Sequence, residues 1–195
     1  MDEILDRNLF LVKEHVGLFK AANNFDVHDP ATGGEILHCR EDELGLGTKL
    51  LRFTDFKRMT PFRIEVRRPG GGRILTVERG ISIFLSKVDV RDASGIRIGG
   101  FRQKFFSIGG KFDVLGPSDE ALCTLEGKWT GWNFQFVKGG RRLAEVSKKW
   151  AGIGKEFFTS ADNYVLHIDE VVPRGDAVRP LILASVLCID MVLKE

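Results

Sequence analysis

Short runs of alternating apolar and polar residues recur along most of the chain, and each follows a cluster of turn-forming residues. Gly and Asp in these clusters allow the positive φ angles or side-chain hydrogen bonds that tight turns require. The clusters occupy residues 29–34, 68–72, 92–95, 116–120 and 138–140. The strand-like runs that follow them are residues 35–39, 73–77, 96–98, 121–125 and 142–146. This order predicts an antiparallel meander.

The pattern between these runs argues against a parallel α/β sheet, because no segment with helical periodicity separates them. One interruption is expected in residues 41–51, where either a short helix or an irregular crossover fits the sequence. We therefore predict a mainly β protein whose strands lie between about residues 9 and 170.

The C-terminal segment is different, because residues 181–193 contain 11 apolar residues in 13 and only Ser185 and Asp190 are polar. Asp176 can cap a helix there, and Pro180 falls in its first turn, where a missing N–H does no harm. A helix that is apolar on every side must be enclosed by protein or lipid. Thirteen residues span about 20 Å, which is short of a hydrocarbon core of about 30 Å. We therefore predict a helix over about 177–193, enclosed by a closed antiparallel barrel rather than by a bilayer.

Composition fits one folded domain over residues 1–195, with 43% hydrophobic and 29% charged residues and an excess of Phe (15) and Gly (22). The three cysteines, Cys39, Cys123 and Cys188, are too widely spaced to suggest a disulfide framework or a metal pair. The acidic N-terminus has no apolar core of a signal peptide. We therefore expect a cytoplasmic protein, with a peripheral position at a membrane as the other location to consider.

Positive charge is concentrated in the middle of the chain, since residues 51–110 contain 13 basic and 5 acidic residues. A cluster of one sign attracts phosphates or anionic lipid headgroups, and its effect fades with salt. The alternative is a solvated strand face whose counter-charges come from elsewhere in the fold. The cluster is led by Lys57, Arg58, Arg63, Arg67, Arg68 and Arg73. A second candidate group at the later turn comprises Lys138, Arg141 and Arg142.

Motifs of covalent catalysis are missing from the sequence, which has no Gly-x-Ser-x-Gly elbow and no paired carboxylates for acid–base work. His38 and Cys39 are adjacent, so on a strand they point to opposite faces and cannot share a metal. His15, His28 and His167 show no repeated spacing and are expected to be solvated or at the edge of the core. We therefore predict a protein that is not an enzyme, uses no cofactor and has no evident small-molecule substrate.

Residues 148–164, from Lys148 to Tyr164, resemble a long motif of the phospholipid scramblase family, K-x-W-x-G-x-x-[KR]-E-x-F-T-D-A-D-N-[FY]. In that family the motif precedes a C-terminal helix that ends near Ile-Asp, as residues 188–195 do here. The segments 10–16, 23–27 and 61–64 are similar to the family's first strands, so the resemblance covers residues 9–195. The family and its LURP-one-related relatives are taken to share the tubby C-terminal architecture. The resemblance thus implies a twelve-stranded barrel around a hydrophobic helix.

Two features of the family are altered in this sequence. Its Pro-rich arm and palmitoylated cysteine run have no counterpart, and residues 80–87 contain no cysteine, so acylation is not expected. In the segment proposed to bind Ca²⁺, Ser160 replaces an Asp and Val165 replaces a Gly. The oxygen ligands that remain are Asp162, Asn163, Asp169 and Glu170, and they do not form an EF-hand loop. We therefore expect no Ca²⁺ binding tighter than about millimolar.

The function implied by the resemblance is binding of anionic phospholipid and association with a membrane surface, and the family name implies phospholipid scrambling. An interaction or regulatory module that binds a protein or nucleic acid without membrane activity is the alternative. The basic cluster is compatible with both functions, because phosphates attract it in either case.

Overall fold

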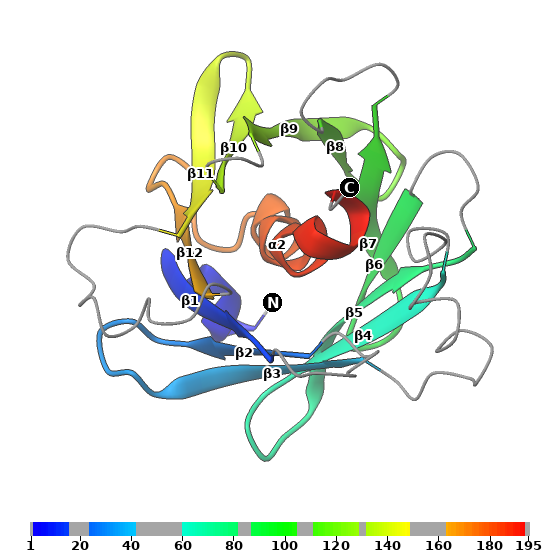
Figure 1. The fold of residues 1–195 in the computed structure, drawn as a ribbon. Coiled ribbons are helices and arrows are strands. Elements are labelled where there is room, and N and C mark those ends of the chain that lie inside the picture. The colour runs from blue at the N-terminus through cyan, green and yellow to red at the C-terminus, as the bar shows by residue number, and fades with distance from the viewer. Residues whose placement is uncertain are drawn as a thin grey trace.

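A computed structural model of the chain describes residues 2–15, 24–41, 60–81, 87–104, 111–128, 132–148 and 163–193 (Figure 1). These residues form twelve strands, a short 3-10 helix and a C-terminal α-helix. The helices are η1 (Glu3–Asp6) and α2 (Val178–Leu193). The strands are β1 (Leu9–Glu14), β2 (Phe25–His28), β3 (Glu35–Glu41), β4 (Phe62–Arg67), β5 (Arg73–Arg79), β6 (Lys87–Asp92), β7 (Arg97–Gln103), β8 (Phe112–Leu115), β9 (Ala121–Lys128), β10 (Asn133–Lys138), β11 (Arg141–Ser147) and β12 (Asn163–Ile168).

The strands form a closed barrel in which every described pair is antiparallel and neighbours follow chain order. The barrel closes where β1 pairs with both β2 and β12, so that Val12 lies opposite Val27 and opposite Tyr164. A strand follows each of the five predicted turn clusters, and the prediction of a mainly β, closed antiparallel barrel is confirmed. Of the interruption expected in residues 41–51, Glu41 ends β3 and the remainder lies outside the described residues.

The predicted apolar helix lies in the middle of the barrel, as the view along the barrel in Figure 1 shows. Every residue from Leu181 to Ile189 is at most 5% exposed. The predicted enclosure is therefore confirmed as far as Ile189, and the side chains that follow are outside the described part of the chain. None of the helices in the described residues combines the length and the apolar character that a membrane span requires.

The beginning of α2 is fixed by polar contacts that the sequence pattern predicts only in part. Asp176 accepts a hydrogen bond from the N–H of Val178 at 2.9 Å, as expected of a cap. Arg179, which the sequence pattern does not single out, has a fully buried side chain that donates to the carbonyls of Val172 (3.1 Å) and Asp6 (3.1 Å). Burial lowers the pKa of this guanidinium. Its hydrogen bonds join α2 to η1, which is also held by the buried Leu5 and by the hydrogen bond that Gly175 N–H donates to Asp6 Oδ1 at 2.6 Å.

A glycine on β7 allows α2 to lie against the barrel wall. A Cβ atom added at Gly99 would lie 2.2 Å from the carbonyl oxygen of Leu115 and 2.9 Å from Leu181 Cδ1. The φ of Gly99 is +154°, a region that other residues rarely adopt. The close contact between strand and helix therefore depends on the missing side chain at this position.

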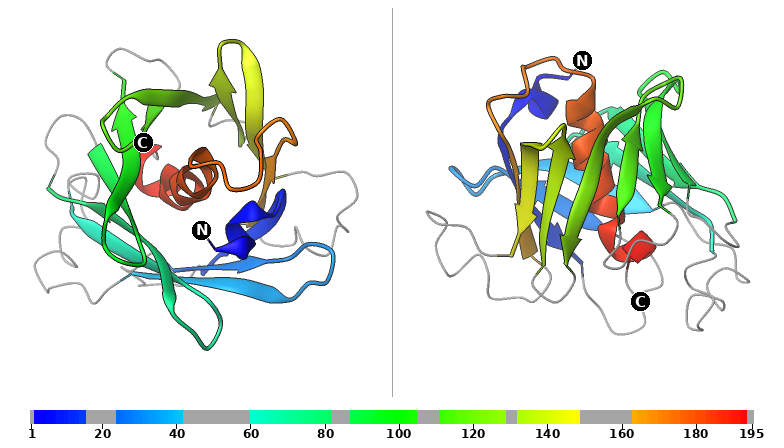
Figure 2. Two further views of the ribbon diagram at one scale, coloured as in Figure 1. Left: turned by 180° about the vertical axis from the view of Figure 1, so that it is seen from behind. Right: turned by 90° about the horizontal axis from the view of Figure 1, so that it is seen from above.

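The two ends of the barrel are distinct because antiparallel strands place alternate connections at opposite ends. The five tight turns, between β2–β3, β4–β5, β6–β7, β8–β9 and β10–β11, share the end at which α2 begins, which we call the turn end. The side view in Figure 2 shows η1 at this end and the C-terminus at the other.

Candidate anion-binding surface

The four arginines of the predicted basic cluster that the structure describes lie on or beside the β4–β5 hairpin. Arg63 and Arg67 project outward from β4, because Ile64 and Val66 face the core. Arg68 follows Arg67 into the turn, and Arg73 begins β5 opposite Arg67. Three of the four therefore gather at the turn end, whereas Arg63 lies about 13 Å further along the strand. Lys57 and Arg58 lie outside the described residues.

Carboxylates accompany the guanidinium groups at the hairpin tip. Arg67 Nε donates to Glu65 Oε2 at 2.9 Å, and Arg73 Nη1 approaches Glu65 Oε1 at 3.4 Å. Arg68 donates from Nε and Nη2 to one oxygen of Asp2, at 2.8 and 2.6 Å. Glu65 is predictable as a neighbour on the outer face of β4, but Asp2 comes from the far N-terminus.

The same pairing extends along the outer face toward β6. Glu78 accepts from Arg63 at 3.4 Å and from Arg91 Nε at 2.6 Å. Burial raises the pKa of Glu65, but hydrogen bonds and charge from Arg67 and Arg73 outweigh this and lower it overall. The carboxylate therefore stays ionised at neutral pH. Such exposed pairs contribute only about 0–1 kcal/mol to stability, but they reduce the attraction of these arginines for an outside anion.

The β10–β11 turn presents its positive charge differently. Gly139 and Gly140 have φ angles of +55° and +78° and form a two-residue turn of the kind that joins tight hairpins. Lys138 and Arg141, on either side, lie directly opposite each other and are both exposed. Among the described residues, no carboxylate lies within ion-pair distance of either side chain. Like charges opposite each other destabilise a hairpin, so the arrangement does not serve stability.

Arg142, the third predicted residue at this turn, is not part of the unpaired group. Its Nε donates to Asp169 Oδ2 at 2.8 Å and its Nη2 to Oδ1 at 3.3 Å. The hydrogen bond that Arg142 donates to Asp169 is the largest cause of a raised pKa of the guanidinium, and the charges of Glu145 and Asp169 raise this pKa further. Arg142 therefore joins β11 to the residues that follow β12.

The calcium candidates do not come together in the described residues. Asn163 begins β12 and Asp169 follows its end, so about 20 Å of strand separates them. Both oxygens of Asp169 accept from Arg142, and Glu170 is exposed beside it. Asp162 lies outside the described residues. The described candidates thus do not fit a shared Ca²⁺ site.

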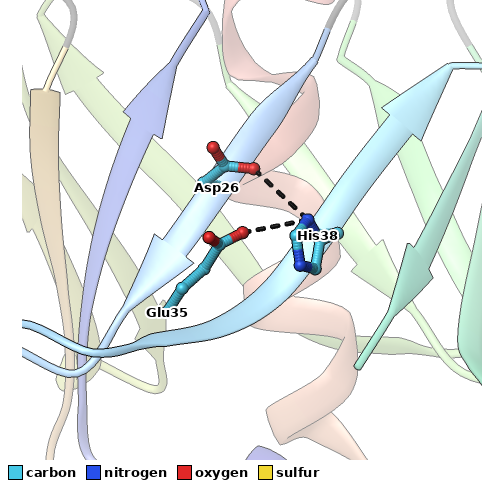
Figure 3. A group of neighbouring side chains, drawn as sticks. All are labelled: Asp26, Glu35 and His38. Atoms are coloured by element: carbon cyan, nitrogen blue, oxygen red, sulfur yellow. Dashed lines mark ion pairs between the residues drawn. The ribbon is translucent and has the colours of Figure 1, made fainter. Parts of the chain in front are cut away.

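A different group of possible metal ligands, which the sequence analysis did not anticipate, lies on the β2–β3 hairpin (Figure 3). His38 Nδ1 lies 2.9 Å from Glu35 Oε1 and 3.8 Å from Asp26 Oδ1. The three ligand atoms lie within 4.8 Å of one another. The histidines show no repeated spacing along the sequence, but His38 is opposite Asp26 across the hairpin. Counting strand positions outward from the 29–34 turn would pair Asp26 with Leu37, and only the register shift between Val27 and His28 brings Asp26 opposite His38.

Neighbouring donors already satisfy the carboxylate at the centre of this group. Arg40 donates from Nη2 to Asp26 Oδ1, and His15 Nε2 contacts Asp26 Oδ2. Burial raises the pKa of Asp26, but these hydrogen bonds outweigh it and lower it. A cation would have to displace Arg40 from the oxygen that faces His38. The group is therefore best described as a hydrogen-bond network that joins β1, β2 and β3.

Comparison with known proteins gives one family and one relative. The profile of the family described as Scramblase matches residues 5–195. The chain is 22% identical over 191 residues to Altered inheritance rate of mitochondria protein 25 from Saccharomyces cerevisiae. That alignment covers 85% of this chain but 58% of the yeast protein, so the chain spans little more than half of that relative. No solved structure gives a significant match.

Proposed function

Since the chain belongs to the scramblase family, whose profile matches residues 5–195, we propose that it binds the surface of anionic phospholipid membranes, without covalent chemistry. The contact is made by the turn end of the barrel. Lys138 and Arg141 at the β10–β11 turn are its centre.

The observation that carries this proposal is the unmatched pair of cations at the β10–β11 turn. Lys138 and Arg141 lie opposite each other at an exposed tip, and no described carboxylate pairs with either. Such an arrangement is unfavourable in the free protein, and phosphate groups outside the protein would relieve it. The sequence places the basic centre on the β4–β5 hairpin instead. There the carboxylates of Asp2, Glu65 and Glu78 pair with the arginines, so the positive charge is less available to a phosphate than at the β10–β11 turn.

The expected strength of this contact is modest. Each Lys or Arg near an anionic surface contributes about 1 kcal/mol, so two give about 2 kcal/mol. Arg174, in the connection between β12 and α2, is exposed at the same end and adds to the attraction. The binding is therefore expected to be weak and sensitive to salt, because the attraction is screened.

Cosedimentation with vesicles tests the proposal. We expect binding to vesicles that contain phosphatidylserine, little binding to pure phosphatidylcholine, and near loss of binding at about 0.5 M salt. Neutralising the two residues in Lys138→Gln/Arg141→Gln should weaken binding about 30-fold, which corresponds to about 2 kcal/mol. Equal binding to neutral and acidic vesicles would contradict the proposal. Binding to DNA or to a protein in place of acidic vesicles would favour the interaction module.

Phospholipid scrambling is the finer activity that the family name suggests. It requires lipid to cross a bilayer, which surface binding does not. Reconstitution of the purified protein into vesicles with a labelled lipid on one leaflet would measure it directly.

A further inference from the structure

Each of the five tight hairpins at the turn end contains a β-bulge close to its turn. In every one of them the register skips one residue of the second strand, which lies between two paired residues and has no Cα partner of its own. The five skipped residues are all aliphatic: Ile36, Ile74, Ile98, Leu122 and Leu143. Bulges are frequent at barrel rims, where they redirect a side chain. The repeated bulge therefore surrounds the turn end with an aliphatic ring, by which we mean these five residues.

The aliphatic ring does not continue along the strands. Two residues further from each turn the chain has a polar residue or a glycine: His38, Thr76, Gly100, Thr124 and Glu145. Four members of the ring are half-buried, whereas Ile74 is 7% exposed. Ile4 on η1 and Val171 after β12 are half-buried at the same end. Apolar surface thus remains partly accessible around the whole turn end.

One apolar side chain at this end is largely exposed. Ile96, at the end of the β6–β7 turn, is 65% exposed. Its backbone is fixed, because its N–H donates to Asp92 Oδ1 at 3.0 Å and its carbonyl accepts from the N–H of Asp92 at 2.9 Å. A single exposed isoleucine needs no explanation by itself. Ile96, however, adds to the aliphatic ring and lies at the end of the barrel that carries Lys138 and Arg141.

The charges around the β6–β7 turn are balanced. Asp92 is the acidic residue of the turn, and its Oδ1 accepts from the N–H groups of Ser94 and Ile96. Two guanidinium groups donate to carbonyls of the same turn: Arg73 to Ala93 at 3.1 Å and Arg91 to Gly95 at 3.2 Å. An acidic surface that approaches Ile96 therefore meets positive as well as negative charge.

We propose that the turn end is an interfacial surface, in which Ile96 enters the boundary between headgroups and acyl chains of an acidic membrane while Lys138 and Arg141 contact the phosphates. Interfacial binding combines burial of apolar area with attraction to anionic lipids. This inference rests on the surface binding proposed above and adds an apolar contribution that salt does not screen. It also orients the barrel, because α2 then begins near the membrane and its C-terminal end points away from it.

A fluorescent label tests the insertion, and the burial of the native thiols makes the labelling selective. Cys39, Cys123 and Cys188 are all buried, so Ile96→Cys can be labelled with nitrobenzoxadiazole in preference to them. The emission should rise and shift to shorter wavelength when the protein binds vesicles that contain phosphatidylserine. The matched control is Ile81→Cys, because Ile81 is 78% exposed and follows β5 at the opposite end of the barrel. Its emission should not change.

The outcomes separate this inference from the proposed function. Unchanged emission from labelled Ile96→Cys in protein that cosediments with the vesicles would overturn the insertion and leave the surface binding intact. An equal rise at positions 81 and 96 would overturn the orientation and with it the proposal. Absence of cosedimentation in the wild type would overturn both the inference and the proposed function.

Salt dependence gives a second, label-free readout. Ile96→Ser should weaken binding to these vesicles about fivefold, whereas Ile81→Ser should leave it unchanged. Because burial of an apolar side chain is not screened, this fivefold ratio should be the same at about 0.05 and 0.15 M salt, while the effect of Lys138→Gln/Arg141→Gln shrinks. Equal binding by Ile96→Ser and wild type, or a ratio that falls with salt as that of the double variant does, would refute the proposal.

Discussion

The β4–β5 and β10–β11 hairpins both bring positive side chains to the turn end, but they differ in what lies beside those charges. At β4–β5, Arg67 and Arg73 share Glu65, and Arg68 is held by Asp2. At β10–β11, Lys138 and Arg141 face each other. The strand order separates the two hairpins by half the barrel, and Figure 1 shows them on opposite sides of α2.

This difference shows that a local count of charges does not give the local field. The β4–β5 region has the larger number of arginines, but Glu65 and Glu78 lie on the same hairpin and Asp2 comes from 66 positions away, and these carboxylates pair with the arginines. The β10–β11 turn has fewer cations, and none of the described carboxylates pairs with two of them. The carboxylates beside each cation therefore decide which group can attract a phosphate.

The largest expected effect on stability comes from disrupting α2, the central helix that supports both hairpins. Leu187 is fully buried on α2, so Leu187→Asp places an unpaired carboxylate inside the barrel. This should cost several kcal/mol and abolish soluble, folded protein. Leu187→Met, which conserves volume, is the control and should cost less than about 1.5 kcal/mol. Circular dichroism and solubility measure both, and a soluble, folded Leu187→Asp protein would contradict the enclosed helix.

This enclosure, the barrel and the position of Glu65 beside Arg67 were predictable from the sequence, but the charge pairs between distant residues were not. An apolar helix over 181–193 needs a closed shell, and Gly and Asp in the turns determine where strands begin. Arg68 pairs with Asp2 only after the barrel closes. His38 meets Asp26 across a hairpin with a register shift between Val27 and His28. Such contacts depend on register and tertiary position, which alternation alone does not specify.

A gain of binding would sharpen the comparison of the two hairpins. Glu65→Gln removes the carboxylate that Arg67 and Arg73 share, so their positive charge becomes available to a phosphate. We expect acidic vesicles to bind about fivefold more tightly, which corresponds to about 1 kcal/mol. Glu126→Gln on β9 removes an equal charge from a surface pair with Lys111 and is the control. An equal gain in both variants would show that net charge alone matters.

The pH dependence of stability distinguishes the hairpins in a second way. The folded pKa of Glu65 lies below its ordinary value of 4.5, so its pairs stabilise the folded state fully above pH 4.5. This contribution is lost as the pH falls through the lower folded pKa. The stability difference between the wild type and Glu65→Gln should therefore shrink on acidification. Urea unfolding at pH 7 and below pH 4 measures it, and a difference that grows in acid would refute the pairing.

The smallest expected effect is a change in the free energy of unfolding, and its sign is opposite at the two hairpins. Lys138→Glu creates a cross-strand pair with Arg141 and should stabilise the protein by about 0.2–1 kcal/mol. Arg67→Glu places a second carboxylate beside Glu65 and should destabilise it by a similar amount. Thermal unfolding of the two variants provides the comparison. Destabilisation by Lys138→Glu would mean that Lys138 has a counter-charge in solution.

The most direct test of the account compares two double variants that remove the same charge from the two hairpins. Lys138→Gln/Arg141→Gln and Arg67→Gln/Arg68→Gln each lose two positive charges, so net charge is matched. Vesicles containing phosphatidylserine should bind the first about 30-fold more weakly than wild type and the second only about threefold more weakly. An equal loss in both, or a larger loss at Arg67 and Arg68, would contradict the assignment of the β10–β11 turn as the contact surface.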